Sequence, residues 1–307
     1  MRPRRLVGLA SILIDRTLAV PALPPRGGDV IAEDLGPAAG GGINALVAAA
    51  RLGLATVYAG RHGSGPHGEL VREALRREGI SCLTPATPDR DTGWCLALVE
   101  PDGERTFVTA PGAEAVQDAA SLAGIALRPD DAVYVSGYDL VYPDAGPALA
   151  TWLAALPREA AGGPWVVVDP GPLVGEVDPA RLRAVVARAD LVSVSAAESA
   201  VIAALPPPRR LVIRHGADGA ELRCADGAEM RVTGTAPPGP VIDTNGAGDT
   251  HLGAMLAARS DGLDWRGSLT LANRAAAFAI TRRGAASGPT RLDLGLRSPS
   301  SWPGRTP

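Results

Sequence analysis

The chain has 307 residues, of which 46% are hydrophobic and 21% are charged, and this composition is typical of a globular fold with a sizeable core. Its net charge of −3 and its pI near 5.9 give no electrostatic reason to expect nucleic acid or a membrane surface as a partner. The chain contains no lysine, so a Walker-type phosphate loop, which needs a lysine on the β- and γ-phosphates, is excluded.

The amino terminus and the cysteines indicate a cytoplasmic protein. The apolar run at residues 6–13 is short and is followed by Asp15 and Arg16, so it predicts a first β-strand and not a signal peptide. No stretch approaches the ~20 apolar residues of a membrane span. Three cysteines lie far apart without metal-ligand spacing, which is typical of thiols in a reducing compartment: Cys82, Cys95 and Cys224.

Short apolar runs that predict strands alternate with segments that predict helices. In chain order, the predicted strands are residues 6–14, 56–59, 94–99, 132–135, 165–168, 191–194 and 211–213. The predicted helices are residues 43–52, 68–78, 145–156, 179–188, 196–204, 248–259 and 265–281. This alternation predicts an α/β fold in which helices flank a mostly parallel central sheet on both faces.

Two regions interrupt this alternation. Residues 15–36 and 88–112 are extended and rich in Pro and Gly, and the second predicts a hairpin around Asp102-Gly103. Antiparallel pieces inserted in this way predict a small β lid over a site. We therefore expect one α/β domain over residues 1–297 that carries the two lid segments, and a frayed tail at residues 298–307.

Residues 243–249, with the sequence DTNGAGD, have the pattern of an anion-binding turn between a strand and a helix. We interpret residues 241–242 as the end of that strand. Gly246 and Gly248 allow the backbone to approach a ligand closely. The amides of Gly246, Ala247 and Gly248 would point outward at a helix amino end, where free N–H groups and the helix dipole bind anions. Such amides can stabilise the charge on a transferred phosphoryl group.

The two acidic residues of this turn each have two interpretations. Asp249 can cap the helix, or it can accept the proton of an attacking hydroxyl as a general base. Asp243 can bond backbone amides at a strand end, or it can organise a cation beside the anion-binding turn. The spacing alone favours neither interpretation.

The turn resembles the second signature of the PfkB (ribokinase-like) family of carbohydrate and nucleoside kinases, which has the form DTxGAGD. All of the specified positions match: Asp243, Thr244, Gly246, Ala247, Gly248 and Asp249. The resemblance, which runs from about residue 7 to residue 290, implies a ribokinase-like fold and transfer of the γ-phosphate of ATP to a hydroxyl, with Asp249 as the base. It also implies Mg²⁺, and a monovalent cation such as K⁺ beside Asp243. His251 stands where the family usually has Phe, and we interpret it as a packing or hydrogen-bonding substitute.

The substrate end is predicted at a second glycine turn, residues 39–53. Asn44 can be a capping residue in the first turn of a helix, or its amide can face a substrate hydroxyl. The segment resembles the first PfkB signature, which implies substrate binding by Gly41, Gly42 and Asn44. Asp15 alone would be a turn residue after a strand, whereas the resemblance implies that it grips substrate hydroxyls.

The lid hairpin also fits this resemblance. Arg105, which follows the hairpin turn, either touches the substrate or braces the lid. Lid closure would exclude water, which competes as a phosphoryl acceptor. Relatives commonly form a homodimer through the lid, so the resemblance implies this assembly as well.

No basic cluster stands out near the lid. We therefore expect an uncharged sugar or nucleoside as the acceptor.

The nucleotide end departs from the family at two positions. Ser195 and Glu198 stand where the family has Asn-x-x-Glu, and the resemblance implies that Glu198 orders the water shell of the Mg²⁺. Arg214 replaces a Thr before the matching Gly216 and Gly219, and its guanidinium can reach the nucleotide phosphates. We expect these residues and Asn273 to bind the nucleotide: Ser195, Arg214, Gly216, Gly219 and Asn273.

Two other functions remain open from the sequence. Residues 63–68 have the form GxGxxG after a strand, which is a weak indication of an NAD(P)-binding oxidoreductase. Against it, Pro66 removes an amide that a pyrophosphate would need. The other alternative is a catalytically inactive sugar- or nucleotide-binding protein on the same fold, which the departures at Ser195 and Arg214 keep open.

Overall fold

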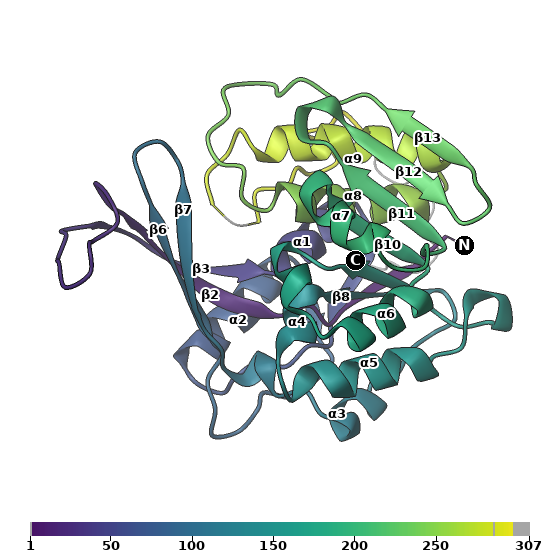
Figure 1. Ribbon diagram of the computed structural model, residues 1–307, viewed down its shortest axis with the longest axis horizontal. Coiled ribbons are helices and arrows are strands. Elements are labelled where there is room, and N and C mark those ends of the chain that lie inside the picture. The colour runs from purple at the N-terminus through teal and green to yellow at the C-terminus, as the bar shows by residue number, and fades with distance from the viewer. Residues whose placement is uncertain (1, 285, 297–307) are drawn as a thin grey trace.

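A large sheet forms the centre of the molecule in the computed structural model, which describes residues 2–284 and 286–296 (Figure 1). Its strand order is β13–β12–β11–β10–β9–β8–β1–β4–β5. In that order the strands are Glu229–Val232, Ala220–Cys224, Arg210–Arg214, Leu191–Ser195, Trp165–Asp169, Asp131–Ser136, Arg5–Gly8, Ala55–Tyr58 and Ser81–Cys82. The strands from β11 to β5 are parallel, and β12 and β13 add an antiparallel edge. The predicted mostly parallel sheet is confirmed.

Helices cover both faces of this sheet (Figure 1). They are α1 (Ile43–Arg51), α2 (Pro66–Arg77), α3 (Ala119–Ala123), α4 (Gly137–Val141), α5 (Ala145–Ala155), α6 (Pro179–Arg188), α7 (Ala196–Ala203), α8 (Ala247–Ser260) and α9 (Trp265–Ala279). One hydrophobic core packs α1, α2, α8 and α9 on the sheet, and a second packs α3 to α7. Successive strand residues alternate between the two cores, as Leu6 and Val7 do, so the central strands are mostly apolar.

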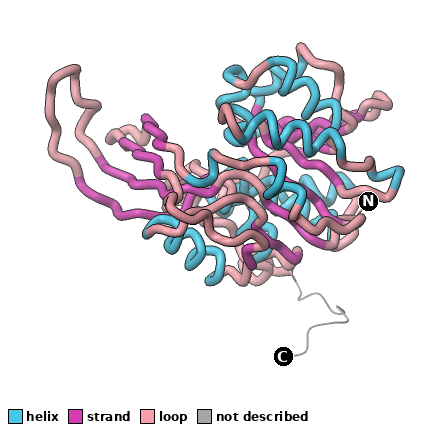
Figure 2. Tube along the Cα trace, turned by 90° about the horizontal axis from the view of Figure 1, so that it is seen from below, coloured by secondary structure: helices cyan, strands magenta, loops and turns pink. Residues whose placement is uncertain are grey.

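The two lid segments form a separate four-stranded sheet with the order β3–β2–β6–β7. Its strands are β2 (Ile12–Ala19), β3 (Glu33–Gly41), β6 (Trp94–Val99) and β7 (Arg105–Ala110). The pairs β2–β3 and β6–β7 are antiparallel, as predicted, whereas β2 and β6 join the two hairpins in parallel. The lid extends to one side of the central sheet (Figure 2).

Two segments near the site differ in the structure from what the sequence predicts. The single strand predicted at residues 6–14 is two strands, because the chain leaves the central sheet after Gly8 and joins the lid at Ile12. The strand end predicted at residues 241–242 is wrong. Pro237, Pro238 and Pro240 offer no amide donors to a ladder, and the amide of Ile242 donates instead to the Ile280 carbonyl at the end of α9 (2.8 Å).

Two further predictions concern the carboxyl-terminal tail and membrane-spanning helices. The predicted tail at residues 298–307 lies outside the described residues. Within the described part of the chain, no helix is both long and apolar enough to cross a membrane.

Candidate active site

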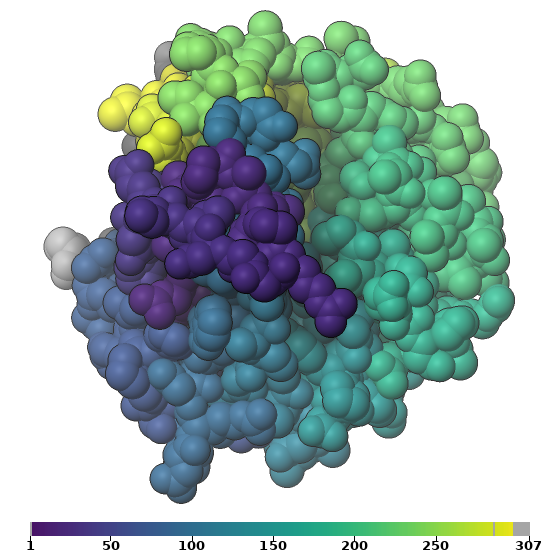
Figure 3. All heavy atoms as spheres, turned by 60° about the vertical axis from the view of Figure 1, so that its left-hand side comes forward, coloured from purple at the N-terminus to yellow at the C-terminus, as the bar shows by residue number. Residues whose placement is uncertain are grey.

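The candidate site lies where the carboxyl ends of the central strands meet the lid. Asp169, Ser195 and Arg214 are the last residues of β9, β10 and β11, so the parallel sheet brings them to one edge. The surface is hollowed between the lid segments, purple and blue in Figure 3, and the green half of the chain. This is the usual position of a ligand site in an open α/β sheet.

The predicted anion-binding turn opens α8. Gly246 is the N-cap residue of this helix and has a φ of +71°, which a side chain would strain. Its carbonyl accepts the Thr250 amide at 2.8 Å, which begins the helix. A Cβ on Gly248 would lie 3.2 Å from guanidinium atoms of Arg214. The positive charge of Arg214 therefore lies beside this turn and adds to the positive end of the helix dipole.

Asp249 lies in the first turn of α8, below the glycine turn. Its two carboxyl oxygens accept hydrogen bonds from Asn44 Nδ2 at 3.2 Å and from Tyr134 Oη at 3.4 Å. Burial and the neighbouring charge of Asp169 raise the pKa of Asp249 to about 7, although Asn44, Arg214 and Tyr134 oppose this shift. A carboxyl group with this pKa can exist in both protonation states near neutral pH, which suits a general base.

Asn44 connects the two predicted ends of the site. Besides its bond to Asp249, its Oδ1 accepts the Ala286 amide at 2.7 Å. Asn44 stands in the first turn of α1, after a glycine turn that packs tightly on the chain after β1. A Cβ on Gly41 or Gly42 would lie within about 2.6 Å of a backbone carbonyl oxygen there, so both positions need glycine.

Asp15 lies on β2 of the lid sheet, against the same glycine turn. A Cβ on Gly40 would overlap the Asp15 carboxylate, so the absent side chain makes room for the acid. Burial raises the pKa of Asp15 to about 6. The structure thus brings Asp15 and Asn44, which come from different predicted motifs, to one side of the site.

Arg214 organises the nucleotide side of the site. Its NH1 donates to Asp169 Oδ2 at 2.7 Å and to Ser193 Oγ at 2.5 Å, and its NH2 lies 3.7 Å from Glu198 Oε2. Three carboxylates, those of Asp169, Glu198 and Asp249, surround this one guanidinium. Although burial opposes the shift, these negative charges raise the pKa of Arg214 above its ordinary value, so the guanidinium stays charged.

Ser195 and Glu198 form a capping box at the start of α7. The Glu198 amide donates to Ser195 Oγ at 3.3 Å, and the Ser195 amide donates to Glu198 Oε2 at 2.7 Å. The shorter serine therefore keeps the local structure that holds Glu198 at the sheet edge.

Gly216, Gly219 and Asn273 lie beside a separate cavity of about 320 Å³ near β13. Both glycines have positive φ, +59° and +100°. Asn273 Nδ2 donates to the carbonyls of Val232, at 3.4 Å, and Thr233, at 3.0 Å, and these two residues line the cavity. Asn273 is buried, so it holds the wall of this cavity in place.

His251 bonds to Asn273 and is not available as a base. Because Asn273 Nδ2 donates, its Oδ1 must accept, so His251 Nε2 donates to it at 3.2 Å. Burial, with a contribution from Arg214, lowers the pKa of His251 to about 3. The ring is therefore neutral, in agreement with a packing role.

Arg105 and Asp243 meet although they come from the lid and from the anion-binding turn. Arg105 NH2 lies 2.5 Å from Asp243 Oδ1. The same oxygen accepts the Asn245 amide at 2.8 Å, and Asp243 Oδ2 accepts the Gly284 amide at 3.0 Å. Both oxygens of this carboxylate therefore already have partners within the protein.

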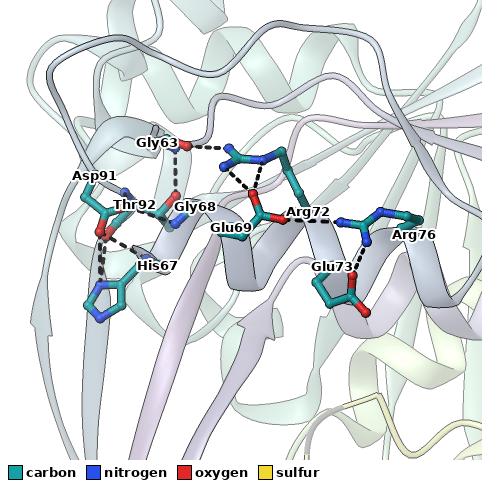
Figure 4. Close-up of polar contacts among 9 residues, drawn as sticks. All are labelled: Gly63, His67, Gly68, Glu69, Arg72, Glu73, Arg76, Asp91 and Thr92. Atoms are coloured by element: carbon teal, nitrogen blue, oxygen red, sulfur yellow. Dashed lines mark hydrogen bonds and ion pairs between the residues drawn. The ribbon is translucent and has the colours of Figure 1, made fainter. Parts of the chain in front are cut away.

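The GxGxxG segment at residues 63–68 does not offer a pyrophosphate site. Asp91 Oδ2 accepts the His67 amide at 3.0 Å and Asp91 Oδ1 accepts the Gly68 amide at 2.8 Å, so a carboxylate already occupies the amino end of α2 (Figure 4). The Gly63 amide donates to Thr92 Oγ1 at 2.8 Å. These contacts remove the structural basis for a dinucleotide-binding interpretation.

Comparison with solved structures defines the class of this fold as ribokinase-like. A ribokinase from Cryptococcus neoformans in complex with ADP matches with a TM-score of 0.80 at 21% identity, covering 96% of this chain and 99% of that one. The Arabidopsis thaliana ribokinase complexed with ribose and ATP matches with a TM-score of 0.74 at 20% identity, covering 96% and 98%.

The chain belongs to the pfkB family of carbohydrate kinases, whose model matches residues 4–291. Members of this family are phosphotransferases that act on an alcohol group. The uncharacterized sugar kinase YegV of Escherichia coli is 33% identical over 94% of this chain and 92% of its own length. A fructokinase of Vibrio alginolyticus is 28% identical over 82% and 88%.

Three residues of the site were not predicted from the sequence: Asp169, Ser193 and Tyr134. Asp169 follows the predicted strand 165–168 directly, so an acid at a strand end was a signal that could have placed it at the sheet edge. Ser193 and Tyr134 lie inside strands, where apolar neighbours on both sides hide their role.

Proposed function

We propose that this protein transfers the γ-phosphate of ATP to a hydroxyl of a sugar or a nucleoside, with Asp249 as the general base. The observation that carries this proposal is the position of a carboxyl group of pKa about 7 in the first turn of α8, beside a glycine turn faced by Arg214. The acceptor oxygen attacks the γ-phosphorus, the bond to the ADP oxygen breaks, and the hydroxyl proton moves to Asp249. The amides of Gly246, Ala247 and Gly248 stabilise the charge on the transferred group.

Asp15, Gly41, Gly42 and Asn44 bind the acceptor. The ionised Asp15 accepts hydrogen bonds from substrate hydroxyls. Gly41 and Gly42 let the turn before α1 pack on Ala10 and Ser11, which holds their backbone and Asn44 beside the acceptor. Asn44 already contacts Asp249, so it can align the reacting hydroxyl with the base. Positioning of this kind lowers the entropic part of the barrier.

Five residues bind the nucleotide or support its site: Ser195, Arg214, Gly216, Gly219 and Asn273. Arg214 contacts the phosphates at the anion-binding turn, and Asn273 supports the wall near the two glycines. Glu198 would hold Mg²⁺ through water, and this ion neutralises the phosphates during transfer. The capping box that holds Glu198 at the carboxyl end of β10 supports this assignment.

An uncharged acceptor fits these residues better than a sugar phosphate. The guanidinium of Arg105 is bound to Asp243, and that of Arg214 lies at Gly248 on the nucleotide side of the site, so neither is placed to hold a phosphate on the acceptor. The family resemblance also suggests a homodimer through the lid sheet, in which Phe107 and Val108 on β7 are exposed.

A phosphoryl-transfer assay tests this proposal. The protein is incubated with Mg-ATP and a panel of sugars, nucleosides and sugar phosphates, and ADP is measured, with Asp249→Asn as the matched control. We expect turnover of an uncharged sugar or nucleoside by the wild type alone. Panel members that raise the unfolding temperature without any turnover would instead support the inactive binding protein.

A further inference from the structure

The ion pair between Arg105 and Asp243 joins two parts of the fold that are 138 residues apart in the chain. Arg105 begins β7, next to the turn of the lid hairpin, and it pairs with Val99 across that hairpin. Asp243 begins the anion-binding turn. Both side chains are largely buried, with exposed fractions of 21% and 12%, so solvent screens their attraction only in part.

The carboxylate of Asp243 has little capacity for another cation. It accepts the Asn245 amide, the Gly284 amide and the Arg105 guanidinium, and the guanidinium neutralises its charge. A K⁺ ion at this carboxylate would lie beside the positive Arg105 and would compete with it for the same oxygens. The monovalent cation that the family resemblance implies at Asp243 therefore does not fit the residues present.

We infer that the Arg105 guanidinium takes the place of a monovalent cation at Asp243 and ties the lid to the phosphate-binding turn. The inference rests on the proposed function in that it concerns the same turn. Arginine suits this role because it stays charged at any physiological pH, and its NH2 donates a charge-assisted hydrogen bond to Asp243 Oδ1. Because the cation is attached to the lid, closing the lid and ordering the turn become one event.

The other contacts of Asp243 explain how its ion pair with Arg105 can affect the phosphate site. Asp243 Oδ1 holds both Arg105 and the Asn245 amide, and Asn245 directly precedes Gly246. Asp243 Oδ2 holds Gly284, in the loop that also presents the Ala286 amide to Asn44. Arg105 is thus a positioning residue, since it acts through Asp243 on both sides of the site.

Thermal unfolding without substrate tests the cation replacement directly. Unfolding temperatures are measured in KCl and in choline chloride at equal ionic strength, about 0.1 M. We expect the same unfolding temperature for the wild type in both salts. Arg105→Ala and the more conservative Arg105→Gln should unfold at lower temperature in choline chloride, and KCl should restore several degrees because K⁺ now binds at Asp243.

A matched control separates this effect from a general loss of lid charge. Arg26 is an exposed arginine in the loop between β2 and β3, and Arg26→Ala should behave as the wild type in both salts. The inference is overturned if KCl stabilises the wild type as much as the Arg105 variants, or if it stabilises neither variant.

Turnover with an identified acceptor gives a second measurement. The wild-type rate should be equal in the two salts, whereas Arg105→Ala should lose about tenfold in choline chloride and regain activity in KCl. A several-fold activation of the wild type by KCl would contradict the inference. If no acceptor turns over but the salt response of the variants appears on unfolding, the proposed function fails and the cation replacement is still supported.

Discussion

Two of the glycine turns that open helices in this chain, those before α2 and α8, differ in what faces their amino ends. At α2, the turn at residues 63–68 meets Asp91, whose carboxylate accepts the amides of His67 and Gly68 (Figure 4). At α8, the turn at residues 243–249 meets Asn44 and the Arg214 guanidinium. A carboxylate from the chain itself fills the first anion-binding position, whereas a cation adds to the second.

The two turns have similar backbone shapes but different roles. Glycine spacing establishes that the backbone can form a tight turn and that the amides point outward. Whether those amides bind a ligand depends on side chains from remote segments. Asp91 comes from the start of the second lid segment, and Arg214 comes from the end of β11. The first turn is therefore structural, and the second is the one that we propose to bind phosphate.

The largest expected effect comes from removing the base at the α8 turn. Asp249→Asn should lower kcat by about 10³-fold, because the attacking hydroxyl then has no proton acceptor. ATP binding should survive, since the turn and Arg214 are unchanged. Steady-state kinetics and ATP titration check both statements, and a variant with near-normal kcat would remove Asp249 from the mechanism.

Adding one methyl group to each turn sharpens the contrast. In Gly248→Ala the new Cβ would lie 3.2 Å from Arg214, so the guanidinium must move, and kcat/KM for ATP should fall about tenfold. In Gly65→Ala the Cβ would lie 2.5 Å from the Asp91 carboxyl carbon, which should lower the unfolding temperature instead. Equal effects of the two changes on kcat/KM would contradict the separate roles of the turns.

The pH dependence reports on Asp249 at the α8 turn. Burial and Asp169 raise its pKa to about 7, and only the ionised form can accept a proton. The value of kcat/KM should therefore be constant above pH 7 and fall about tenfold for each unit below it. Asp169→Asn should move this limb to lower pH, because it removes the neighbouring negative charge; an unmoved limb would show that another group titrates.

The smallest effect is expected at the α2 turn. Asp91→Ala removes the acceptor for the His67 and Gly68 amides and should cost about 1–2 kcal/mol of unfolding free energy, with kcat unchanged. Burial opposes ionisation, but hydrogen bonds from the Gly68, His67 and Thr92 amides hold the pKa of Asp91 below its ordinary value. This stabilisation should therefore be present near neutral pH and be lost as the pH falls through that lowered pKa. Urea unfolding of the wild type and the variant at several pH values measures it, and a large loss of kcat would assign the turn to the active site.

Much of the fold followed from local patterns. The strands at residues 94–99 and 191–194 and the helix at residues 179–188 were predicted within one residue, because apolar strands and amphipathic helices differ in period. The antiparallel edge strands β12 and β13 were missed, since short strands with polar residues carry a weak pattern. The segment at residues 241–242 was assigned to a strand, although the prolines before it prevent a ladder.

The sequence by itself determined the parallel sheet, the lid and the positions of Asp249, Asn44 and the glycine turns, because each depends on residues close together in the chain. Only the tertiary structure decided which charge faces each turn. Asp91 lies 23 residues from Gly68, Arg105 lies 138 residues from Asp243, and Asn44 lies 205 residues from Asp249. Such partners meet only when the sheets have formed, so the spacing of motifs along the chain does not predict these contacts.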